Sequence, residues 1–155
     1  MTEENNYLTK EKFQELTNEL EHLKTSKRKE VAESLEYARS LGDLSENAEY
    51  QEAREMQAST EERITQLERV LKNPQIVSHK KGDTVSLSSV VVIQKDGEKE
   101  THEYILVGSE EADIQQRKIS YLSPLGDAMM NKKKGESFTF ETPNGKQVYT
   151  IKSID

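Results

Sequence analysis

Two carboxylates three residues apart stand out in a short segment that otherwise has the composition of a turn. Asp43 and Glu46 lie in the run Leu41-Gly42-Asp43-Leu44-Ser45-Glu46. One interpretation is a capping box, in which each carboxylate binds free backbone N–H groups at the start of a helix. The other is a pair of exposed ligands for a hard cation such as Mg²⁺. The pattern alone favours capping and leaves the metal interpretation open.

Two carboxylates alone would bind Mg²⁺ weakly. The ion takes six oxygen ligands in near-octahedral geometry, so the others would have to come from a partner or from substrate phosphates. Basic residues flank the pair, Arg39 four residues before Asp43 and Arg54 eight after Glu46. Contact with a phosphate backbone is one interpretation of each arginine. A surface ion pair with a neighbouring glutamate is at least as good a match to the pattern.

No complete active site is predicted in the chain. The sequence contains no phosphate-binding Gly-Lys-Ser/Thr loop, no dinucleotide glycine fingerprint and no Gly-x-Ser-x-Gly elbow. It has no cysteine, which excludes disulfides, thiol catalysis and cysteine-ligated zinc. His22, His79 and His102 fall in three different predicted elements, and we expect all three to face solvent.

Two long helices are predicted to position the carboxylates and arginines. Apolar residues recur at spacings of three and four on both sides of the turn. The first series is Phe13, Leu16, Leu20, Leu23, Val31, Leu35 and Ala38, and the second is Tyr50, Ala53, Gln57, Thr60, Ile64, Leu67 and Leu71. With Thr9 and Asp43 as the two caps and Gly42 ending the first helix, we expect an antiparallel hairpin roughly 40 Å long.

The residue types change near Lys72-Asn73-Pro74. Before this point the chain has one glycine and no proline, and after it come six glycines, three prolines and runs of Val, Ile and Thr. Proline disfavours helical geometry in the residue before it, so the first helical domain is expected to end here. The sequence therefore predicts two domains, a coiled-coil hairpin over residues 1–73 and a globular domain over residues 74–155.

The second domain is predicted to be a small antiparallel sheet with one short helix. Strands are expected over residues 84–87, 89–93, 103–107 and 146–154, and a further strand is expected where Phe138 and Phe140 alternate with polar residues. Asp96-Gly97 and Asn144-Gly145 are typical of tight turns. Ser123 can cap a helix that begins at Pro124 and runs through Met130. The expected fold class is α+β.

Composition excludes some partners. The formal net charge is −7, and the first 73 residues carry −6 of it. This acid excess argues against a protein that covers duplex DNA with a basic face.

No stretch approaches the ~20 apolar residues of a membrane helix, and the first ten residues lack the pattern of a secretory signal. We therefore expect a cytoplasmic protein. Only 32% of the residues are hydrophobic, which favours an extended molecule over a single thick core.

The segment from Ala38 to Tyr50, with its contiguous Gly-Asp-Leu-Ser-Glu-Asn-Ala-Glu-Tyr, strongly resembles the tip signature of the bacterial Gre transcript cleavage factors. The resemblance runs from about Leu8 to Ile154. A second matching signature consists of Glu110-Glu111-Ala112-Asp113, Ile119-Ser120 and Ser123-Pro124-Leu125-Gly126. The tip lacks the run of aspartates seen in the inhibitory paralogues. Its basic residues are scattered, so the chain is more similar to the A type than to the B type.

The resemblance implies a fold and a function. Gre factors pair an antiparallel coiled coil with a domain like that of FKBP prolyl isomerases, and they insert the coiled coil into the secondary channel of RNA polymerase. There they stimulate the polymerase's own cleavage of the backtracked RNA 3′ end, so the factor itself is not an enzyme. Asp43 and Glu46 match the two tip acids, which would help to hold a Mg²⁺ shared with the polymerase and not stably bound by the factor alone. Arg39 and Arg54 match residues thought to engage the transcript.

Other interpretations stay open beside this one. Ser123, Pro124 and Leu125 are candidate polymerase contacts, although packing at a helix start would also explain them. A regulator that occupies the channel without stimulating cleavage is the main functional alternative. A prolyl isomerase with a helical extension is a third, disfavoured by a second half with no Trp and only two Phe. We expect the free protein to be a monomer.

Overall fold

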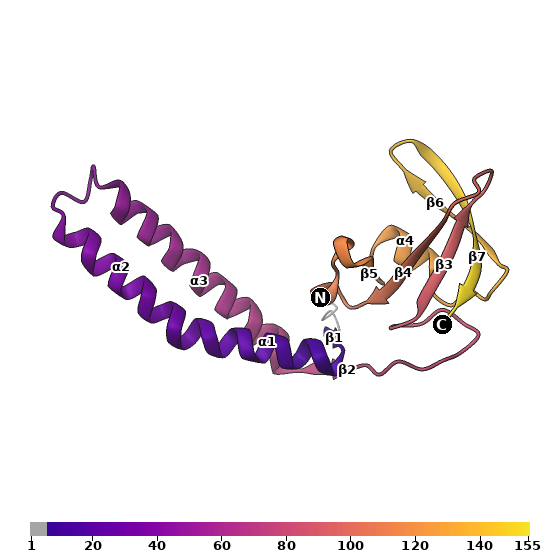
Figure 1. Cartoon of the computed structure of the whole chain (residues 1–155), viewed down its shortest axis with the longest axis horizontal. Coiled ribbons are helices and arrows are strands. Elements are labelled where there is room, and N and C mark those ends of the chain that lie inside the picture. The colour runs from indigo at the N-terminus through magenta and orange to yellow at the C-terminus, as the bar shows by residue number, and fades with distance from the viewer. Residues whose placement is uncertain (1–5) are drawn as a thin grey trace. The chain divides into compact units, whose positions relative to one another are not determined.

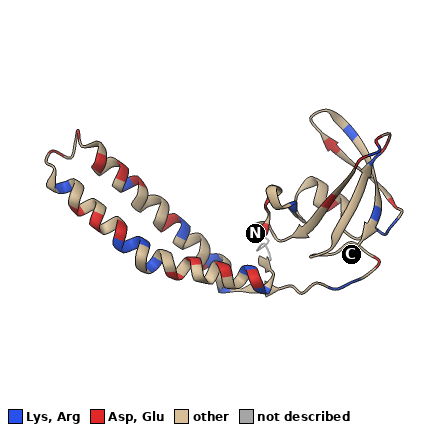
Figure 2. Ribbon diagram, viewed as in Figure 1, with Lys and Arg blue, Asp and Glu red and all other residues tan. Residues whose placement is uncertain are grey.

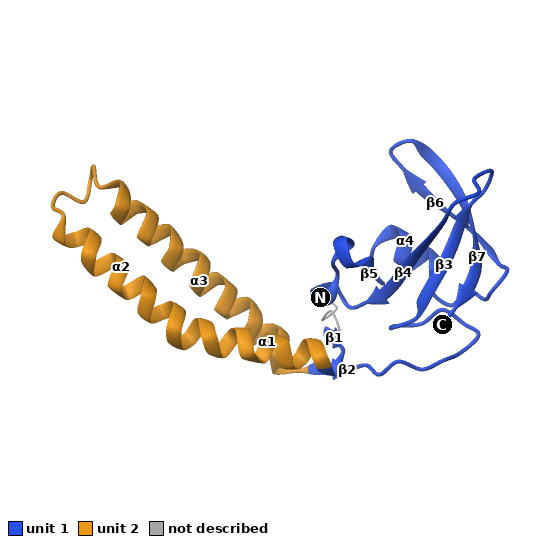
Figure 3. Ribbon diagram, viewed as in Figure 1, with its two compact units in different colours: residues 1–10, 74–155 blue, residues 11–73 orange. Residues whose placement is uncertain are grey.

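The computed structural model describes residues 6–155, which divide into two compact units (Figure 3). One unit is residues 11–73, and the other combines residues 6–10 with residues 74–155. The residue patterns predict the hairpin domain over residues 1–73, of which residues 1–5 lie outside the described residues. Residues 6–10 differ from the expected assignment because β1 (Asn6–Leu8) pairs with β2 (Pro74–Ile76), which follows the hairpin.

The first arm of the hairpin is a continuous helix with one irregular segment. α1 (Lys10–His22) leads into a π-helical stretch, η1 (Leu23–Lys27), and then into α2 (Arg28–Ser40) (Figure 1). The spacing of residues explains the irregularity. From Leu23 to Leu35 the series advances in three steps of four, which is more than the 3.6 residues of an α-helical turn. A wider π-helical turn absorbs the excess and returns Val31 and Leu35 to the buried face.

The second arm, α3 (Ala48–Lys72), runs antiparallel to the first, so the predicted hairpin is confirmed. Its buried residues are Ala53, Thr60, Ile64, Leu67 and Val70. The predicted seam is wrong at Gln57, which is exposed, because Met56 packs in its place against the buried cluster of Val31, Leu35 and Ala53. A strict seven-residue repeat drifts around a straight helix by ~20° per heptad, which accounts for the one-residue offset.

Ion pairs link the two arms on either side of the narrow apolar seam. Arg28 binds Glu61 through two bonds of 2.9 Å, and Arg63 binds Glu19 through bonds of 2.8 and 3.0 Å. Lys24 Nζ lies 2.6 Å from Glu68. Exposed pairs contribute ~0–1 kcal/mol each, so these pairs add only a little to the stability that the apolar seam supplies. Their main effect is to fix the alignment of the two arms. Charges of both signs cover the hairpin (Figure 2), and no helix within residues 6–155 is long and apolar enough to span a membrane.

A single asparagine joins the two arms at the turn. The Asn47 Nδ2 atom donates to the backbone oxygen of Ala38 at 2.6 Å, and its Oδ1 accepts from the Tyr50 N–H at 3.1 Å. One amide therefore satisfies a carbonyl at the end of α2 and an N–H at the start of α3. The prediction of Asp43 as this cap is wrong, because Asn47 is the residue that directly precedes α3.

The second unit contains a curled, mostly antiparallel sheet. Its five strands lie in the order β5 (Lys118–Ser120), β4 (Thr101–Val107), β3 (Val90–Lys95), β7 (Gly145–Ile154) and β6 (Ser137–Thr142). Among these five described strands, β4 and β5 form the one parallel pair. The expected strand over residues 84–87 does not form, because Thr84 makes only an isolated bridge to Lys133. The other predicted strands and the α+β class are confirmed.

The core of this unit lies between the sheet and α4 (Pro124–Met129). Its buried members are Val85, Val91, Ile93, Leu106, Ile119, Met129, Phe138 and Ile151. Two 3-10 turns, η2 (Ser109–Glu111) and η3 (Ile114–Gln116), connect β4 to β5. The predicted cap of α4 is confirmed, since Ser123 Oγ accepts from the Gly126 N–H at 3.1 Å. The short helix thus seals one side of the sheet.

The chain before the hairpin is held within the second unit by close contacts. The backbone of Tyr7 crosses Gly108 so closely that a Cβ there would meet the Tyr7 carbonyl oxygen. The buried Glu111 accepts from the Thr9 N–H at 3.2 Å and from the Thr9 hydroxyl at 2.7 Å. Leu8 is also buried. These contacts anchor residues 6–9 immediately before the first helix begins.

Replacing Gly108 with alanine should destabilise the second unit by about 1–3 kcal/mol, because the added methyl group forces β1 away from its place. Gly82→Ala is a matched control, since a Cβ there meets nothing within 4 Å, and it should cost less than ~0.5 kcal/mol. Urea unfolding followed by tyrosine fluorescence measures both values. Equal stability of the two variants would contradict the close packing of β1.

Substitutions of Asn47 should separate its two hydrogen bonds. Asn47→Asp keeps the oxygen that accepts from Tyr50 but replaces the donor to Ala38 with a second oxygen, whereas Asn47→Ala removes both bonds. We expect the Tyr50 amide to exchange with solvent about fivefold faster in Asn47→Ala, from the loss of a ~1 kcal/mol cap, and at the wild-type rate in Asn47→Asp. Residue-resolved hydrogen exchange tests this. Unchanged exchange in the alanine variant would exclude Asn47 as the cap.

Candidate functional site

Asp43 lies in the exposed turn between α2 and α3 and makes its bonds locally. Its Oδ1 accepts from the Ser45 N–H at 3.0 Å and from the Ser45 hydroxyl at 2.9 Å. The backbone N–H first, and the hydroxyl second, hold the pKa of the Asp43 carboxyl below its ordinary value. The carboxylate is therefore ionised at neutral pH. Its Oδ2 makes no hydrogen bond to any residue that the structure describes, so one oxygen is left facing solvent.

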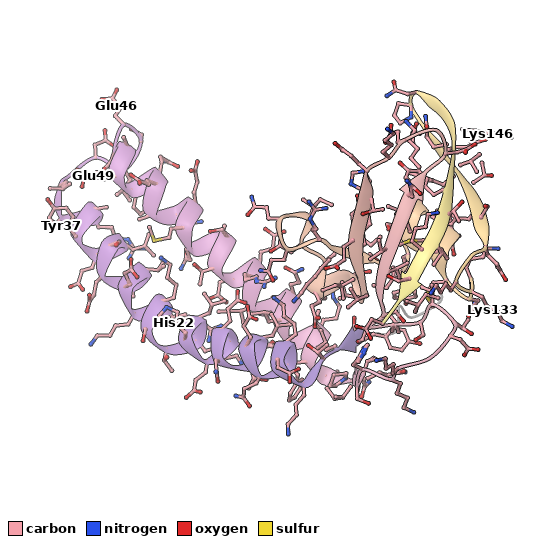
Figure 4. The ribbon with its side chains drawn as sticks, turned by 45° about the vertical axis from the view of Figure 1, so that its right-hand side comes forward. His22, Tyr37, Glu46, Glu49, Lys133 and Lys146 are labelled. Atoms are coloured by element: carbon pink, nitrogen blue, oxygen red, sulfur yellow. The ribbon has the colours of Figure 1, made fainter. Side chains whose placement is uncertain are left out.

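Glu46 lies at the same turn, and its side chain points away from the hairpin (Figure 4). It makes no hydrogen bond or ion pair to the described part of the chain, so the reciprocal bond of a capping box is absent there. Both predicted acids line one shallow hollow, together with Leu41, Asn47, Ala48 and Glu49. The pattern-based preference for capping is wrong, because Asn47 caps the helix and leaves both acids exposed.

The two acids can supply only part of a metal site. Residues 6–155 contain no group of three His, Cys, Asp or Glu side chains arranged to hold a metal ion. The available donors at the tip are carboxylate oxygens, the ligand type that Mg²⁺ prefers. The donor chemistry fits Mg²⁺, but the number of ligands fits only an ion that is also held by something else.

Arg39 comes from α2 and Arg54 from α3, and both guanidinium groups act on Tyr50. The Arg39 guanidinium lies over the Tyr50 ring, 6.0 Å from its centroid. The Arg39 guanidinium first, and the Arg54 guanidinium after it, lower the pKa of the Tyr50 phenol below its ordinary value. Neither arginine forms an ion pair within residues 6–155, whereas Arg28 and Arg63 each bind a glutamate. The surface ion pairs that the pattern also allowed are therefore absent for these two arginines.

The residues of the C-terminal signature lie in the other unit and have packing roles. Ser123 Oγ caps α4 and also donates to the Ser120 backbone oxygen at 2.6 Å. Leu125 packs against the sheet core. Pro124, at the first position of α4, is exposed and has the surface available for a partner. These contacts explain Ser123 and Leu125 as parts of the fold.

The histidines do not add to the site. His79 Nδ1 lies 2.9 Å from the Ser88 backbone oxygen, His22 is exposed at the end of α1, and His102 is half-buried in β4. The expectation that all three face solvent is thus wrong for His102, because the side chains of an antiparallel strand alternate between the two faces of the sheet.

Three residues of the tip were missed by the sequence reasoning. Asn47 joins the helices, Ser45 holds Asp43, and the Tyr50 ring lies under the Arg39 guanidinium. Asn47 had a usable signal, since asparagine immediately before a helical series is as good a cap as aspartate. Ser45 follows Asp43 at the spacing of an Asx turn. Tyr50 had no signal, because contact with Arg39 depends on how two helices pack.

Comparisons with known proteins match nearly the whole chain to transcription elongation factors. A family model described as "Transcription elongation factor, N-terminal" matches residues 6–76, and one described as "Transcription elongation factor, GreA/GreB, C-term" matches residues 79–155. A protein named transcription elongation factor GreA from Clostridium acetobutylicum is 43% identical over 157 residues, covering 99% of each chain. Its namesake from Caldanaerobacter subterraneus is 47% identical over 140 residues, covering 89% of each.

A solved structure also aligns over 97% of this chain and 99% of its own, with 26% identity and a TM-score of 0.43. It is the crystal structure of GreA factor homolog 1 from Thermus thermophilus. The two family models together account for nearly all of residues 6–155. On the strength of those two matches and the near full-length identity to named relatives, the chain belongs to the GreA/GreB family of transcription elongation factors.

Proposed function

We propose that this transcription elongation factor binds RNA polymerase, inserts its hairpin tip through the secondary channel, and stimulates the polymerase's intrinsic cleavage of backtracked RNA 3′ ends. Arrested complexes would thereby resume synthesis. The observation that carries the proposal is the pair of carboxyl side chains, Asp43 and Glu46, exposed at the turn of a hairpin only two helices wide. Family membership, with its named relatives, supports the same role.

The tip acids are proposed to complete a metal site that neither protein forms alone. Asp43 offers Oδ2 while its Oδ1 is held by Ser45, and Glu46 offers an unpaired carboxylate. A Mg²⁺ ion shared with the polymerase would supply charge neutralisation at the scissile phosphate and an activated water. The bonds from Ser45 orient Asp43 before any ion arrives, which lowers the entropic cost of binding.

The number of metal ligands at the tip indicates which protein, the factor or the polymerase, performs the cleavage. Within residues 6–155 no third His, Cys, Asp or Glu is arranged with the two carboxylates, and two carboxylates alone would bind the ion weakly. We therefore infer that the chain is not an enzyme and that the polymerase performs the cleavage. The free factor is proposed to be a monomer of the cytoplasm, and Pro124 is its remaining candidate for contact with the channel rim.

Arg39 and Arg54 are proposed to contact the phosphates of the extruded RNA. Guanidinium groups bind phosphate oxygens in pairs, and these two are not neutralised by any acid in the described chain. They stand beside the turn that carries the acids. The factor would thus hold the RNA backbone on one side of its tip while the acids face the bond to be cut.

Replacing both tip acids with alanine should reduce transcript cleavage to the rate of polymerase without factor, while binding to polymerase stays within about twofold of wild type. Release of short labelled 3′ fragments from a backtracked complex in Mg²⁺ measures cleavage, and competition for polymerase measures binding. The matched control is Glu33→Ala with Glu36→Ala. These acids have the same spacing and are also exposed, and their loss should leave cleavage intact.

Each outcome of this experiment is informative. Wild-type cleavage by the tip double variant would remove Asp43 and Glu46 from the mechanism. Polymerase binding without any cleavage by the wild-type factor would instead favour a regulator that only occupies the channel. An equal loss of cleavage in the control variant would show that the effect comes from the change in net charge.

Ser45→Ala should raise the pKa of the Asp43 carboxyl toward its ordinary value, because one of the two hydrogen bonds to the carboxylate is lost and the backbone bond remains. A carboxyl with a lowered folded pKa stabilises the turn above its unfolded pKa, and that stabilisation is lost as pH falls through the folded pKa. Carbon-detected NMR titration of Asp43 from neutral to acidic pH measures the shift. Ser59→Ala is the control, since Ser59 bonds to Met56 instead, and no change in Ser45→Ala would contradict the predicted role.

A further inference from the structure

The large hydrophobic side chains that the hairpin exposes are gathered next to its turn. Within residues 11–73 they are Tyr37, Leu41 and Leu44, and the other large apolar side chains of the hairpin are buried or half-buried. Tyr37 is 61% exposed and Leu41 is 51% exposed, and the two lie one helical turn apart. Exposed apolar side chains that occur together, rather than singly, mark surfaces that contact another molecule.

Tyr37 borders a groove between the two arms, which we term the arm groove. Its lining residues are Ser34, Tyr37, Glu49, Glu52, Ala53 and Met56. Glu49 also lines the hollow that contains Asp43 and Glu46, so the two depressions adjoin. Figure 4 shows Tyr37, Glu46 and Glu49 at the same end of the hairpin. The arm groove has a volume of about 330 Å³, which suits protein side chains better than a single ion.

The arm groove combines an apolar base with acidic residues. Ala53 is buried and Met56 packs beside it in the cluster that joins the arms. Glu49 and Glu52 are exposed, and neither forms an ion pair within residues 6–155. No basic residue lines the groove. Because the two glutamates lie one turn apart on α3, their like charges repel each other and favour a cationic partner.

Charge indicates which class of molecule fits the arm groove. The carboxylates of the groove and of the adjoining hollow repel the phosphates of RNA. Arg39 and Arg54, which are proposed to contact RNA, line neither depression. A polypeptide that carries Lys or Arg beside apolar side chains matches both parts of the groove. Its apolar groups would bury Tyr37 and Met56, while its cations would neutralise the glutamates.

We infer that the arm groove binds a basic segment of the polymerase polypeptide that also carries apolar side chains. The inference rests on the proposed function for the identity of the partner, and it gives a role to Tyr37, Glu49 and Glu52, which the proposed cleavage chemistry does not use. Tyr37 is the expected anchor, because aromatic side chains supply much of the binding energy at protein interfaces. This contact holds the tip through protein, separately from the proposed contacts with metal and RNA.

A photoreactive benzoylphenylalanine in place of Tyr37 identifies the neighbour of the arm groove directly. In a complex of the factor with polymerase and a backtracked transcript, we expect a protein–protein cross-link to a polymerase segment that contains Lys or Arg next to apolar residues. The matched control carries the same group in place of Glu36, which is also exposed on α2 but lines neither depression, and it should cross-link far less. A cross-link from position 37 to RNA, equal cross-linking from both positions, or no cross-link to polymerase would overturn the inference.

Tyr37→Ala removes the exposed ring beside the groove. We expect the Kd for polymerase to rise about tenfold, as for the loss of an aromatic anchor, whereas the control Glu36→Ala should stay within about twofold of wild type. The melting temperature should stay close to that of wild type, because the Tyr37 side chain is mostly exposed. Competition with labelled factor for polymerase measures the Kd. A wild-type Kd for Tyr37→Ala would remove it as the anchor and reject the inference.

Glu49→Gln with Glu52→Gln tests the acidic part of the groove. We expect association with polymerase to become about fivefold slower and its rate to depend less on salt. The matched control is Glu33→Gln with Glu36→Gln, a pair with the same spacing, the same change in net charge and exposed side chains outside the groove. Equal slowing in the two double variants would assign the effect to net charge and contradict the inference.

Measuring binding and cleavage on the same variants separates this inference from the proposed function. A factor that cross-links to polymerase from position 37, and is weakened by Tyr37→Ala, but never stimulates cleavage would uphold the groove and count against the proposed function alone. A wild-type factor that stimulates cleavage, together with a Tyr37→Ala variant that binds and cleaves equally well, would reject the groove and leave the proposed function in place.

Discussion

The geometry of the tip depends on the two hydrogen bonds of the Asn47 side chain. One goes to the carbonyl of Ala38, the neighbour of Arg39, and the other comes from the N–H of Tyr50. The same amide therefore fixes the turn that carries Asp43 and Glu46 and ties the end of α2 to the start of α3. A turn without this link would leave two carboxylates on a flexible loop, where each would pay a larger entropic cost to bind any ion.

Charge is distributed along the hairpin according to position. Along the arms, basic residues are matched with acids on the opposite helix, as in Arg28 with Glu61 and Arg63 with Glu19. At the tip the matching stops, because Glu46 has no partner in the described chain and Arg39 meets a tyrosine. Matched charges steady two helices that share a narrow apolar seam. Unmatched charges at the end remain available for an ion or a phosphate from another molecule.

Much of the fold follows from local patterns that sequence reasoning can use. The periodicity of apolar residues predicts both helices, and Ser123 before Pro124 predicts the start of α4, because caps and turns depend on neighbours in the chain. The errors arise where tertiary packing decides. Asn47 and Asp43 have equal capping chemistry, and only the helix start distinguishes them. The docking of residues 6–8 beside β2 and the meeting of Arg39 with Tyr50 join distant positions that no local pattern relates.

The pairing of β1 with β2 makes the hairpin a modular insertion. Asn6 lies opposite Pro74 and Leu8 opposite Ile76, so the chain leaves the second unit and returns to it at neighbouring points. Inserted segments with adjacent ends are tolerated well, since their closure does not depend on what lies between them. Whole heptads could be added to or removed from both arms in register during evolution without altering the host domain. The reach of the tip and the fold that anchors it are thus free to diverge independently.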